Sequence, residues 1–257
     1  MQEFLQKGMS PNTKNKRGSC IAFKAIKNGH QEILKTLLEN GADPQGPTAL
    51  SHEEGSLLLY AVTHDSLEVI DILLDNGADI NKHSYGSTPL RNAIKRKDMK
   101  IIKHLLNHTA DVNEMNLYQD KTVLMEGIAI GNKDIVNLLI KSGAAVNEIA
   151  INGNTALHTA VILGDNEMVK LLLDNKAEIN TWSHYSSGGT VLTEAIKQND
   201  LDIAQTLLDY GANPNDARHG GETALVAASQ KNNTNTLVDL LLEKGADINT
   251  TDSHGKW

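Results

Sequence analysis

One short signature recurs along the whole chain at nearly constant intervals. It reads Gly-Ala-Asp-x-Asn or a close variant, as GADPQ at 41, GADIN at 77, TADVN at 109, GAAVN at 143, KAEIN at 176, GANPN at 211 and GADIN at 245. Successive copies begin 32 to 36 residues apart, and a degenerate copy, GMSPN, begins at Gly8. A period of this size indicates a repeat protein, in which each module is stabilised by its neighbours.

A second signature lies 21 residues before each copy of the first, or 22 residues before the last copy. It reads CIAF at 20, SLLL at 56, TPLR at 88, TVLM at 122, TALH at 155, TVLT at 190 and TALV at 223. Thr88 followed by Pro89 is a helix start, because a hydroxyl can cap free N–H groups and proline suits the first helical position. Seven pairs of signatures in register predict seven modules.

Each module has room for two helices. The sixth residue of each unit is always small, which indicates close backbone approach between helices; these residues are Ala25, Ala61, Ala93, Gly127, Ala160, Ala195 and Ala228. Residues that tolerate left-handed geometry end the first helix, Gly29, Gly131, Gly164, Asn199 and Asn232 among them. Second helices such as EVIDILLDN and EMVKLLLDN carry an apolar stripe too wide to be covered on one side only. Both neighbouring modules must therefore cover it.

The second helices end on glycine except at Thr109 and Lys176. A left-handed residue other than glycine costs about 1–2 kcal/mol, so we expect these two helix ends to be the least stable. The connections from each Gly-Ala signature to the next helix are polar and vary from 11 to 15 residues, which predicts turns or hairpins. Where a scaffold is constant and its loops vary, function usually lies on the loops.

Composition excludes several classes of protein. The net charge of −8 argues against nucleic-acid binding. The longest apolar run, Leu57 to Val62, is far too short for a membrane span, and residues 1–20 lack the apolar stretch of a signal peptide. Cys20 is the single cysteine, so an internal disulfide is impossible and a reducing compartment is favoured. We expect a cytoplasmic protein, in the host cytosol if it is a secreted effector.

The two signatures resemble those of the ankyrin repeat family. The residues that carry the resemblance are TPLR at 88, TALH at 155, NGHQEIL at 28 and LLLEKGADIN at 240. It implies an all-α repeat solenoid, an ankyrin-type helix-turn-helix stack with short β-hairpin fingers, whose first helices and fingers form a concave surface. It also implies non-catalytic binding of protein partners. The predicted organisation is one domain over 1–257, with partial repeats at 1–12 and 250–257 and full repeats at about 16–45, 52–81, 84–113, 118–147, 151–180, 186–215 and 219–249.

The resemblance also indicates a binding surface, because the family exposes the two residues before each first-helix stop toward partners. Most of these pairs are polar here, but Ala129–Ile130 and Ile162–Leu163 are apolar. Nearby fingers add aromatic and apolar side chains, including Ile149. The predicted partner-binding residues in this part of the chain are Tyr118, Met125, Ile130, Ile151, Ile162, Leu163, Trp182 and Tyr185. The alternative is that Ile130 and Ile162 pack under their own hairpins as core residues.

A basic cluster lies in the preceding repeat. Arg91, Lys95 and Arg96 could receive an acidic segment of a protein or peptide partner and steer its approach. The alternative for these residues is an ordinary solvated helix face.

The chain shows no signature of catalysis, a cofactor or a metal. His104 and His108 lie four apart on a helix, but residue 105 is Leu, so the metalloprotease motif is absent, and no third ligand is near in sequence. We therefore predict no metal site. A phosphate loop and a nucleophile elbow are also absent.

Four further expectations concern individual positions. Cys20 replaces a capping threonine, so the first full repeat is expected to start loosely. The resemblance implies that His158 forms hydrogen bonds within its own hairpin. Family members can be hydroxylated at positions matching Asn81, Asn113, Asn147, Asn180 and Asn249. At the last helix, Leu237, Val238, Leu241 and Leu242 have no obvious cover, which predicts a segment of a longer protein, a cap supplied by another chain, or self-association.

Three functions remain open at this stage. The first is an interaction scaffold that holds a partner on its concave face. The second is the substrate-recruiting part of a larger enzyme or of a bacterial effector. The third is the cytosolic ankyrin array of a membrane protein.

Overall fold

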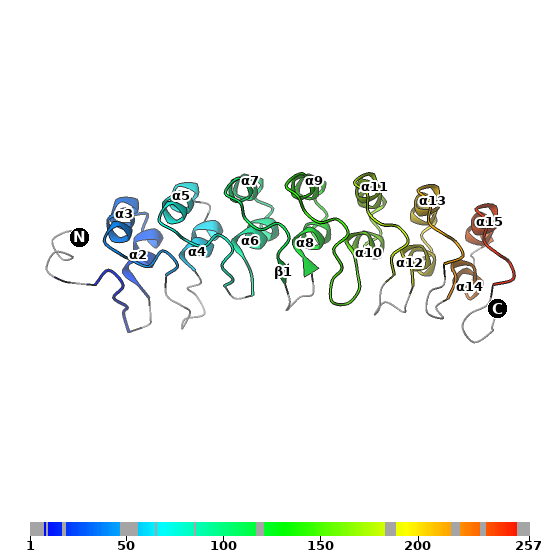
Figure 1. The fold of residues 1–257 in the computed structure, drawn as a ribbon, viewed down its shortest axis with the longest axis horizontal. Coiled ribbons are helices and arrows are strands. Elements are labelled where there is room, and N and C mark those ends of the chain that lie inside the picture. Colours follow the sequence, from blue (N-terminus) through cyan, green and yellow to red (C-terminus); the bar gives the residue numbers. More distant parts are fainter. Residues whose placement is uncertain are drawn as a thin grey trace. The chain divides into compact units, whose positions relative to one another are not determined.

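The computed structural model confirms a helical repeat fold made of consecutive helix pairs (Figure 1). The structure describes residues 8, 10–16, 19–46, 56–64, 66–84, 86–116, 121–182, 189–216, 222–231 and 235–250. Within them, fourteen α-helices form seven pairs, as the seven pairs of signatures predict. The chain divides into two compact units, Met1–Val112 and Asn113–Trp257, which are described separately.

The first unit contains three helix pairs. They are α2 (Ile21–Lys27) with α3 (Gln31–Glu39), α4 (Leu57–Thr63) with α5 (Leu67–Asp75), and α6 (Pro89–Lys95) with α7 (Met99–Asn107). In each pair the second helix packs on the first, and α4 also packs between α2 and α6.

The second unit contains four helix pairs and a short hairpin. They are β1 (Met115–Asn116), β2 (Lys121–Thr122), α8 (Val123–Ala129), α9 (Lys133–Lys141), α10 (Ala156–Ile162), α11 (Asn166–Asp174), α12 (Val191–Gln198), α13 (Leu201–Asp209), α14 (Ala224–Ser229) and α15 (Asn235–Glu243). The helix α10 packs between α8 and α12, and α13 packs between α11 and α15. In the hairpin, Met115 pairs with Thr122 in antiparallel register. This is the predicted finger, built from two residues on each side.

Each first helix begins directly after a capping side chain. The hydroxyl of Thr88 accepts a hydrogen bond from the N–H of Arg91, and Ser56, Thr122, Thr155, Thr190 and Thr223 cap their helices in the same way. In the first full repeat the Cys20 Sγ accepts from the N–H of Phe23 at 3.4 Å, and Cys20 is buried. The thiol therefore takes the place of the capping hydroxyl at this helix start.

The two exceptional helix ends adopt the left-handed backbone that the sequence predicts. Thr109 has a φ of 63° and Lys176 a φ of 67°, while glycine occupies the matching position elsewhere, as at Gly143 with a φ of 92°. The first helices end in the same conformation, on Asn199 at 60° and, unexpectedly, on Lys97 at 58°. The predicted stop at Asn232 lies outside the described residues.

The small residue of each first helix lies where two helices approach closely. A Cβ added at Gly127 of α8 would lie 3.1 Å from Leu139 Cδ1 and 3.5 Å from Val136 Cγ2, both on α9. The equivalent Ala160 and Ala195 are fully buried. Only a small side chain fits between the two helices of a module, as predicted.

A row of asparagine side chains links consecutive modules. The Asn113 Oδ1 accepts a 2.7 Å hydrogen bond from the N–H of Ala145, and its Nδ2 donates to the carbonyl of Gly143 at 3.1 Å. The same pair of bonds is made by Asn12, Asn147 and Asn215, and Asn81 and Asn180 make the bond through Oδ1. We call these six residues the asparagine clamps. They explain why asparagine closes the Gly-Ala signature, since each one orders the next module's signature.

The last helix is better covered than the sequence suggests. Leu237 and Leu241 of α15 are buried within the second unit, which corrects the expectation that both lack cover. Val238 and Leu242, together with Ile248, line a hollow of about 210 Å³. Only these two of the four predicted side chains remain accessible.

Candidate functional site

Large exposed hydrophobic side chains gather on one module of the second unit. The exposed fractions are 59% for Ile149, 62% for Ile151, 41% for Ile162 and 52% for Leu163. The first two lie in the finger that precedes α10, and the other two are the last residue and the C-cap of α10. Exposed apolar side chains on one module mark interaction sites on many proteins, whereas single ones scattered over a surface do not. We call these four residues the apolar surface.

The neighbouring module extends the apolar surface. Ile130 is the C-cap of α8, as Leu163 is the C-cap of α10, and the two helices pack together. Ala129 is exposed and Ile130 is half-buried. The exposure of Ile162 shows that the alternative, in which this side chain is core, is wrong.

A hollow lies next to the apolar surface, between two successive fingers. Its volume is about 250 Å³, and its lining residues are Ile149, Gly153, Thr155, Glu178, Asn180, Thr181 and Trp182. A bridge between Trp182 and Thr190 fixes the backbone at the tryptophan. Trp182 is half-buried, so its ring forms part of the wall rather than projecting into solvent.

Polar groups border the apolar surface on the α12 side. The Gln198 Nε2 donates to the carbonyl of Ile162 at 3.5 Å and to Glu194 Oε1 at 3.1 Å. Lys197 forms an ion pair with Glu222 at 3.5 Å. An apolar centre with a polar rim is the arrangement that protein interfaces show.

Two of the predicted partner-binding residues are buried. Met125 has an exposed fraction of 2% and Arg91 of 0%, so neither presents a surface to a partner. Both occupy the third position after a capping threonine, on the inward face of the first helix. Lys95 and Arg96 are exposed at the end of α6 in the first unit. Tyr118 and Tyr185 lie outside the described residues.

His158 is a structural residue of the helix N-terminus. Its Nδ1 accepts a 3.3 Å hydrogen bond from the N–H of Thr155, and its own N–H donates to the hydroxyl of Thr155 at 3.4 Å. These two bonds form a capping box. Burial of the imidazole lowers the pKa of His158 to about 4, because the charged form would lose its hydration. The residue therefore stays neutral and stabilises the start of α10.

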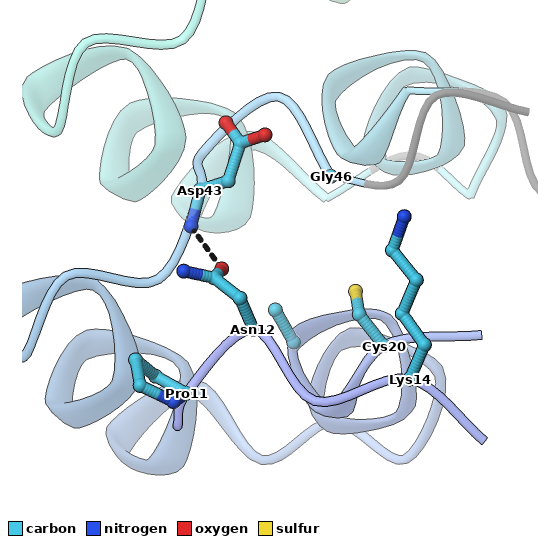
Figure 2. A pocket seen from close by; sticks show the side chains of 7 residues that line it. Pro11, Asn12, Lys14, Cys20, Asp43 and Gly46 are labelled. Atoms are coloured by element: carbon cyan, nitrogen blue, oxygen red, sulfur yellow. Dashed lines mark hydrogen bonds between the residues drawn. The ribbon is translucent and has the colours of Figure 1, made fainter. Parts of the chain in front are cut away.

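The hollow beside Cys20 is also structural. It measures about 250 Å³ and is lined by Pro11, Asn12, Lys14, Cys20, Ala22, Asp43 and Gly46. Figure 2 shows the first asparagine clamp among these residues, with the backbone N–H of Asp43 donating to Asn12 Oδ1. The lining residues include no histidine that could act as a base toward the thiol, and the Sγ caps α2. These groups hold two modules together.

Sequence reasoning missed one cluster of polar side chains. Asp71 of α5 lies 2.6 Å from His104 Nε2 and 3.5 Å from His108 Nε2, measured from its Oδ1. The sequence shows no third potential ligand near His104 and His108, and the fold supplies one from a more distant residue, Asp71. The missing signal was the repeat period, since Asp71 lies 33 residues before His104.

A family model described as ankyrin repeats in three copies matches residues 1–83, 50–116, 90–183 and 182–252. The chain belongs to the ankyrin repeat family. Its ankyrin repeats are typical of modules that bind other proteins and do not catalyse reactions. Among the residues of known placement, no helix is both long and apolar enough to cross a membrane.

Similar ankyrin repeat proteins come from varied sources. The chain is 33% identical to the putative ankyrin repeat protein L371 of Acanthamoeba polyphaga mimivirus, over 83% of this chain and 28% of the relative. It is 30% identical to the nuclear factor NF-kappa-B p105 subunit of Gallus gallus, over 78% of this chain and 21% of that protein. It is 32% identical to the potassium channel AKT2/3 of Arabidopsis thaliana, over 53% of this chain and 16% of the channel. The chain thus spans less than a third of each of these three ankyrin repeat proteins.

The ankyrin repeat domain of Bcl-3 has a similar structure. Its crystal structure matches with a TM-score of 0.75 at 23% identity, over 89% of this chain and 100% of that one. At this identity the likeness shows that the two chains share the ankyrin fold.

Proposed function

We propose that this chain is a non-catalytic interaction module that binds a protein or peptide partner through the apolar surface and the hollow beside it. The observation that carries the proposal is the exposure of Ile149, Ile151, Ile162 and Leu163 on a single module. The family's general role as protein-binding modules supports it. The register supports it as well, because Ile162 and Leu163 precede the stop of a first helix, where ankyrin repeats expose residues toward partners.

The energetics favour an apolar anchor on the partner. Burial of apolar area contributes about 25 cal/mol per Å², so covering four large side chains supplies several kcal/mol toward association. Binding energy concentrates in a few central residues surrounded by a polar rim. Here the centre is Ile162 and Leu163, and Lys197, Gln198 and Glu222 supply the rim.

The hollow suits one side chain of a partner better than a small-molecule ligand. Its volume of about 250 Å³ is below the roughly 300–1,000 Å³ that is typical of small-molecule sites. Ile149 and Trp182 offer apolar and aromatic contact, and Glu178 adds a carboxylate. We infer that it receives an apolar or aromatic side chain adjacent to a basic group.

The exposed cations of the first unit are proposed to act on the rate of association. Lys95 and Arg96 belong to a local basic cluster in a chain whose net charge is −8. Such a cluster attracts an acidic segment and raises the association rate at low salt more than it raises affinity. Arg91 has no part in this role, because it is buried.

Affinity capture with the full chain tests the proposal. The variant Ile151→Ser/Ile162→Ser/Leu163→Ser should lose the partners that the unchanged protein retains, as measured by mass spectrometry and then by the Kd for an identified partner. Leu201→Ser is the matched control, because Leu201 is also exposed, at 38%, but lies at the start of a second helix. Both variants should keep the helical circular dichroism spectrum. Equal capture by a folded triple variant would refute the proposed surface.

The potassium channel among the relatives supports a second candidate, the ankyrin array of a membrane protein. The third candidate is the substrate-recruiting part of a larger enzyme or of an effector. In each case the same surface would bind the partner or substrate protein. The coding sequence on both sides of the region that encodes residues 1–257 separates the three candidates, since apolar spans favour the second and a catalytic motif favours the third.

A further inference from the structure

Three potential metal ligands meet on the second helices of two successive modules in the first unit. Asp71 belongs to α5, His104 to α7, and His108 is the C-cap of α7. One ligand atom from each residue lies within 4.8 Å of the other two. The two imidazole rings lie close together and are tilted relative to each other, with centroids 4.8 Å apart and an interplanar angle of 54°.

The fold brings these groups together for simple reasons. Residues four apart on a helix share a face, so His104 and His108 project from α7 on the same side. The repeat places α5 beside α7 (Figure 1), and the 33-residue separation sets Asp71 opposite the histidine pair. The polar cluster lies on the outer side of the module, away from the buried Ile101, Ile102 and Leu105 of α7.

We propose that Asp71, His104 and His108 bind a divalent transition metal ion of the zinc class. Two imidazoles and one carboxylate are a ligand set that zinc accepts with three protein groups and water in the fourth position. Calcium and magnesium prefer oxygen ligands only, so the two imidazoles select against them.

The distances fit a tetrahedral site after a small movement. Zinc–ligand bonds of about 2.0–2.2 Å at tetrahedral angles separate ligand atoms by about 3.4 Å. The distance from Asp71 Oδ1 to His108 Nε2 is already 3.5 Å. The distance from the same oxygen to His104 Nε2 is 2.6 Å, a hydrogen bond that must lengthen by about 0.8 Å. The ligand nitrogens of the two imidazoles lie within 4.8 Å of each other, so their separation must also change, by at most about 1.4 Å.

The proton balance is also simple. His104 Nε2 and Asp71 Oδ1 are joined by a hydrogen bond. Metal binding requires the lone pair of that nitrogen, so a proton carried there moves to Nδ1 or to solvent. The carboxylate then exchanges a hydrogen-bond donor for the cation.

The side chains leave room for a water ligand. The exposed fractions of the side chains are 22% for His104, 39% for His108 and 45% for Asp71. One side of the cluster is therefore open to solvent. A metal ion bound there would join α5 to α7 and stabilise the contact between two modules. Because the unfolded chain lacks the assembled site, this binding would raise the apparent stability by mass action.

Zinc titration of the full chain tests the site. Isothermal titration calorimetry of chelator-treated protein with zinc chloride should show one saturable equivalent. Each of Asp71→Asn, His104→Gln and His108→Gln should lower the affinity at least about tenfold. Cobalt(II) in place of zinc should give the intense visible absorption of a tetrahedral site, and this absorption should vanish in His108→Gln.

Two controls separate the site from adventitious binding. His30→Gln removes an exposed histidine of another module, and Asp75→Asn removes a carboxylate one turn after Asp71 on the same helix. Both should retain the zinc affinity of the unchanged protein. Zinc should also raise the melting temperature of the unchanged protein and leave that of His108→Gln unaltered.

The outcomes decide the proposal without reference to any protein partner. A zinc affinity at least about tenfold lower in all three ligand variants, with both controls unaffected, supports the proposal. If Asp71→Asn kept the full zinc affinity while His108→Gln lost it, only the two histidines would bind the metal. This result would refute the three-ligand site. Absence of any saturable zinc equivalent would refute it outright.

Discussion

The side-chain oxygen of Asn147 accepts a 2.8 Å hydrogen bond from the backbone N–H of Glu178, in the following module. The amide nitrogen of the same Asn147 donates to the carbonyl of Lys176 at 3.1 Å. One side chain thus satisfies two backbone groups in a turn that has no partner of its own for them. Because Lys176 is one of the two second-helix ends where glycine is missing, this asparagine clamp stabilises a strained turn.

Asn147→Ala should therefore destabilise the chain. Two lost hydrogen bonds, each with a net contribution of about 1 kcal/mol, predict a decrease of about 1–2 kcal/mol in the free energy of unfolding. Urea denaturation measures it. Asn137→Ala on α9 is the control, and it should be neutral or slightly stabilising, because alanine favours the helix. A decrease of equal size in both variants would show that the clamp contributes nothing specific.

The strained helix end at Thr109 offers a gain in stability. Its φ of 63° is unfavourable for a β-branched residue, by about 1–2 kcal/mol, and glycine removes this strain. Glycine also gives the unfolded chain more freedom, so Thr109→Gly should stabilise by a net of about 0.5–1 kcal/mol. Thermal unfolding of the full chain measures the shift in Tm.

Gly143→Ala is the reverse experiment. Gly143 has a φ of 92°, and an added Cβ would meet no other heavy atom within 4 Å. Any loss of stability in Gly143→Ala therefore comes from backbone strain alone. We expect the free energy of unfolding to decrease by about 1–2 kcal/mol. Thr109→Gly should raise the stability and Gly143→Ala should lower it. If both variants changed the stability in the same direction, backbone strain would not be the explanation.

The sequence predicts the modules well because their signals are local and repeat. Capping threonines and glycine stops each act within one module, and the wide apolar stripe recurs in every module. A copy that departs from the pattern is therefore recognised from the other copies. The asparagine clamps were visible as a periodic residue, but their role depends on a backbone N–H about 30 residues away. Only the folded chain shows that hydrogen bond.

The candidate site was predictable in part. Ile162 and Leu163 are exposed as their register implies, at the end of a first helix. Arg91 and Met125 were assigned wrongly because their residue types suggested a surface, whereas their register matches that of the buried His158. All three are the third residue after a capping threonine. Position in the module decides burial there, even for arginine.

Gly127 tests the close approach of the two helices within a module. Alanine occupies the equivalent position in every other module, and it gains about 1 kcal/mol over glycine inside a helix. The added Cβ would lie 3.1 Å from Leu139 Cδ1, the end of a flexible side chain, so part of this gain is lost. We expect Gly127→Ala to stabilise by about 0.5 kcal/mol and Gly127→Val to destabilise clearly. Chemical denaturation of both variants measures the difference.

His158 makes the stability of the second unit depend on pH. Burial lowers the pKa of His158 from 6.5 to about 4, so the unfolded chain binds more protons than the folded chain between these values. Burial of the neutral imidazole carries no charge penalty above about pH 6.5, and the free energy of unfolding decreases as the pH falls toward 4. The full decrease is about 3 kcal/mol.

The variant His158→Gln isolates this effect from other titrating groups. Glutamine can accept the N–H of Thr155, as the imidazole does, but it does not titrate. The free energy of unfolding of the variant should therefore fall less steeply between pH 6.5 and 4 than that of the unchanged protein. Parallel curves for the two proteins would mean that His158 titrates alike in the folded and unfolded chains, and that its burial does not suppress its charge.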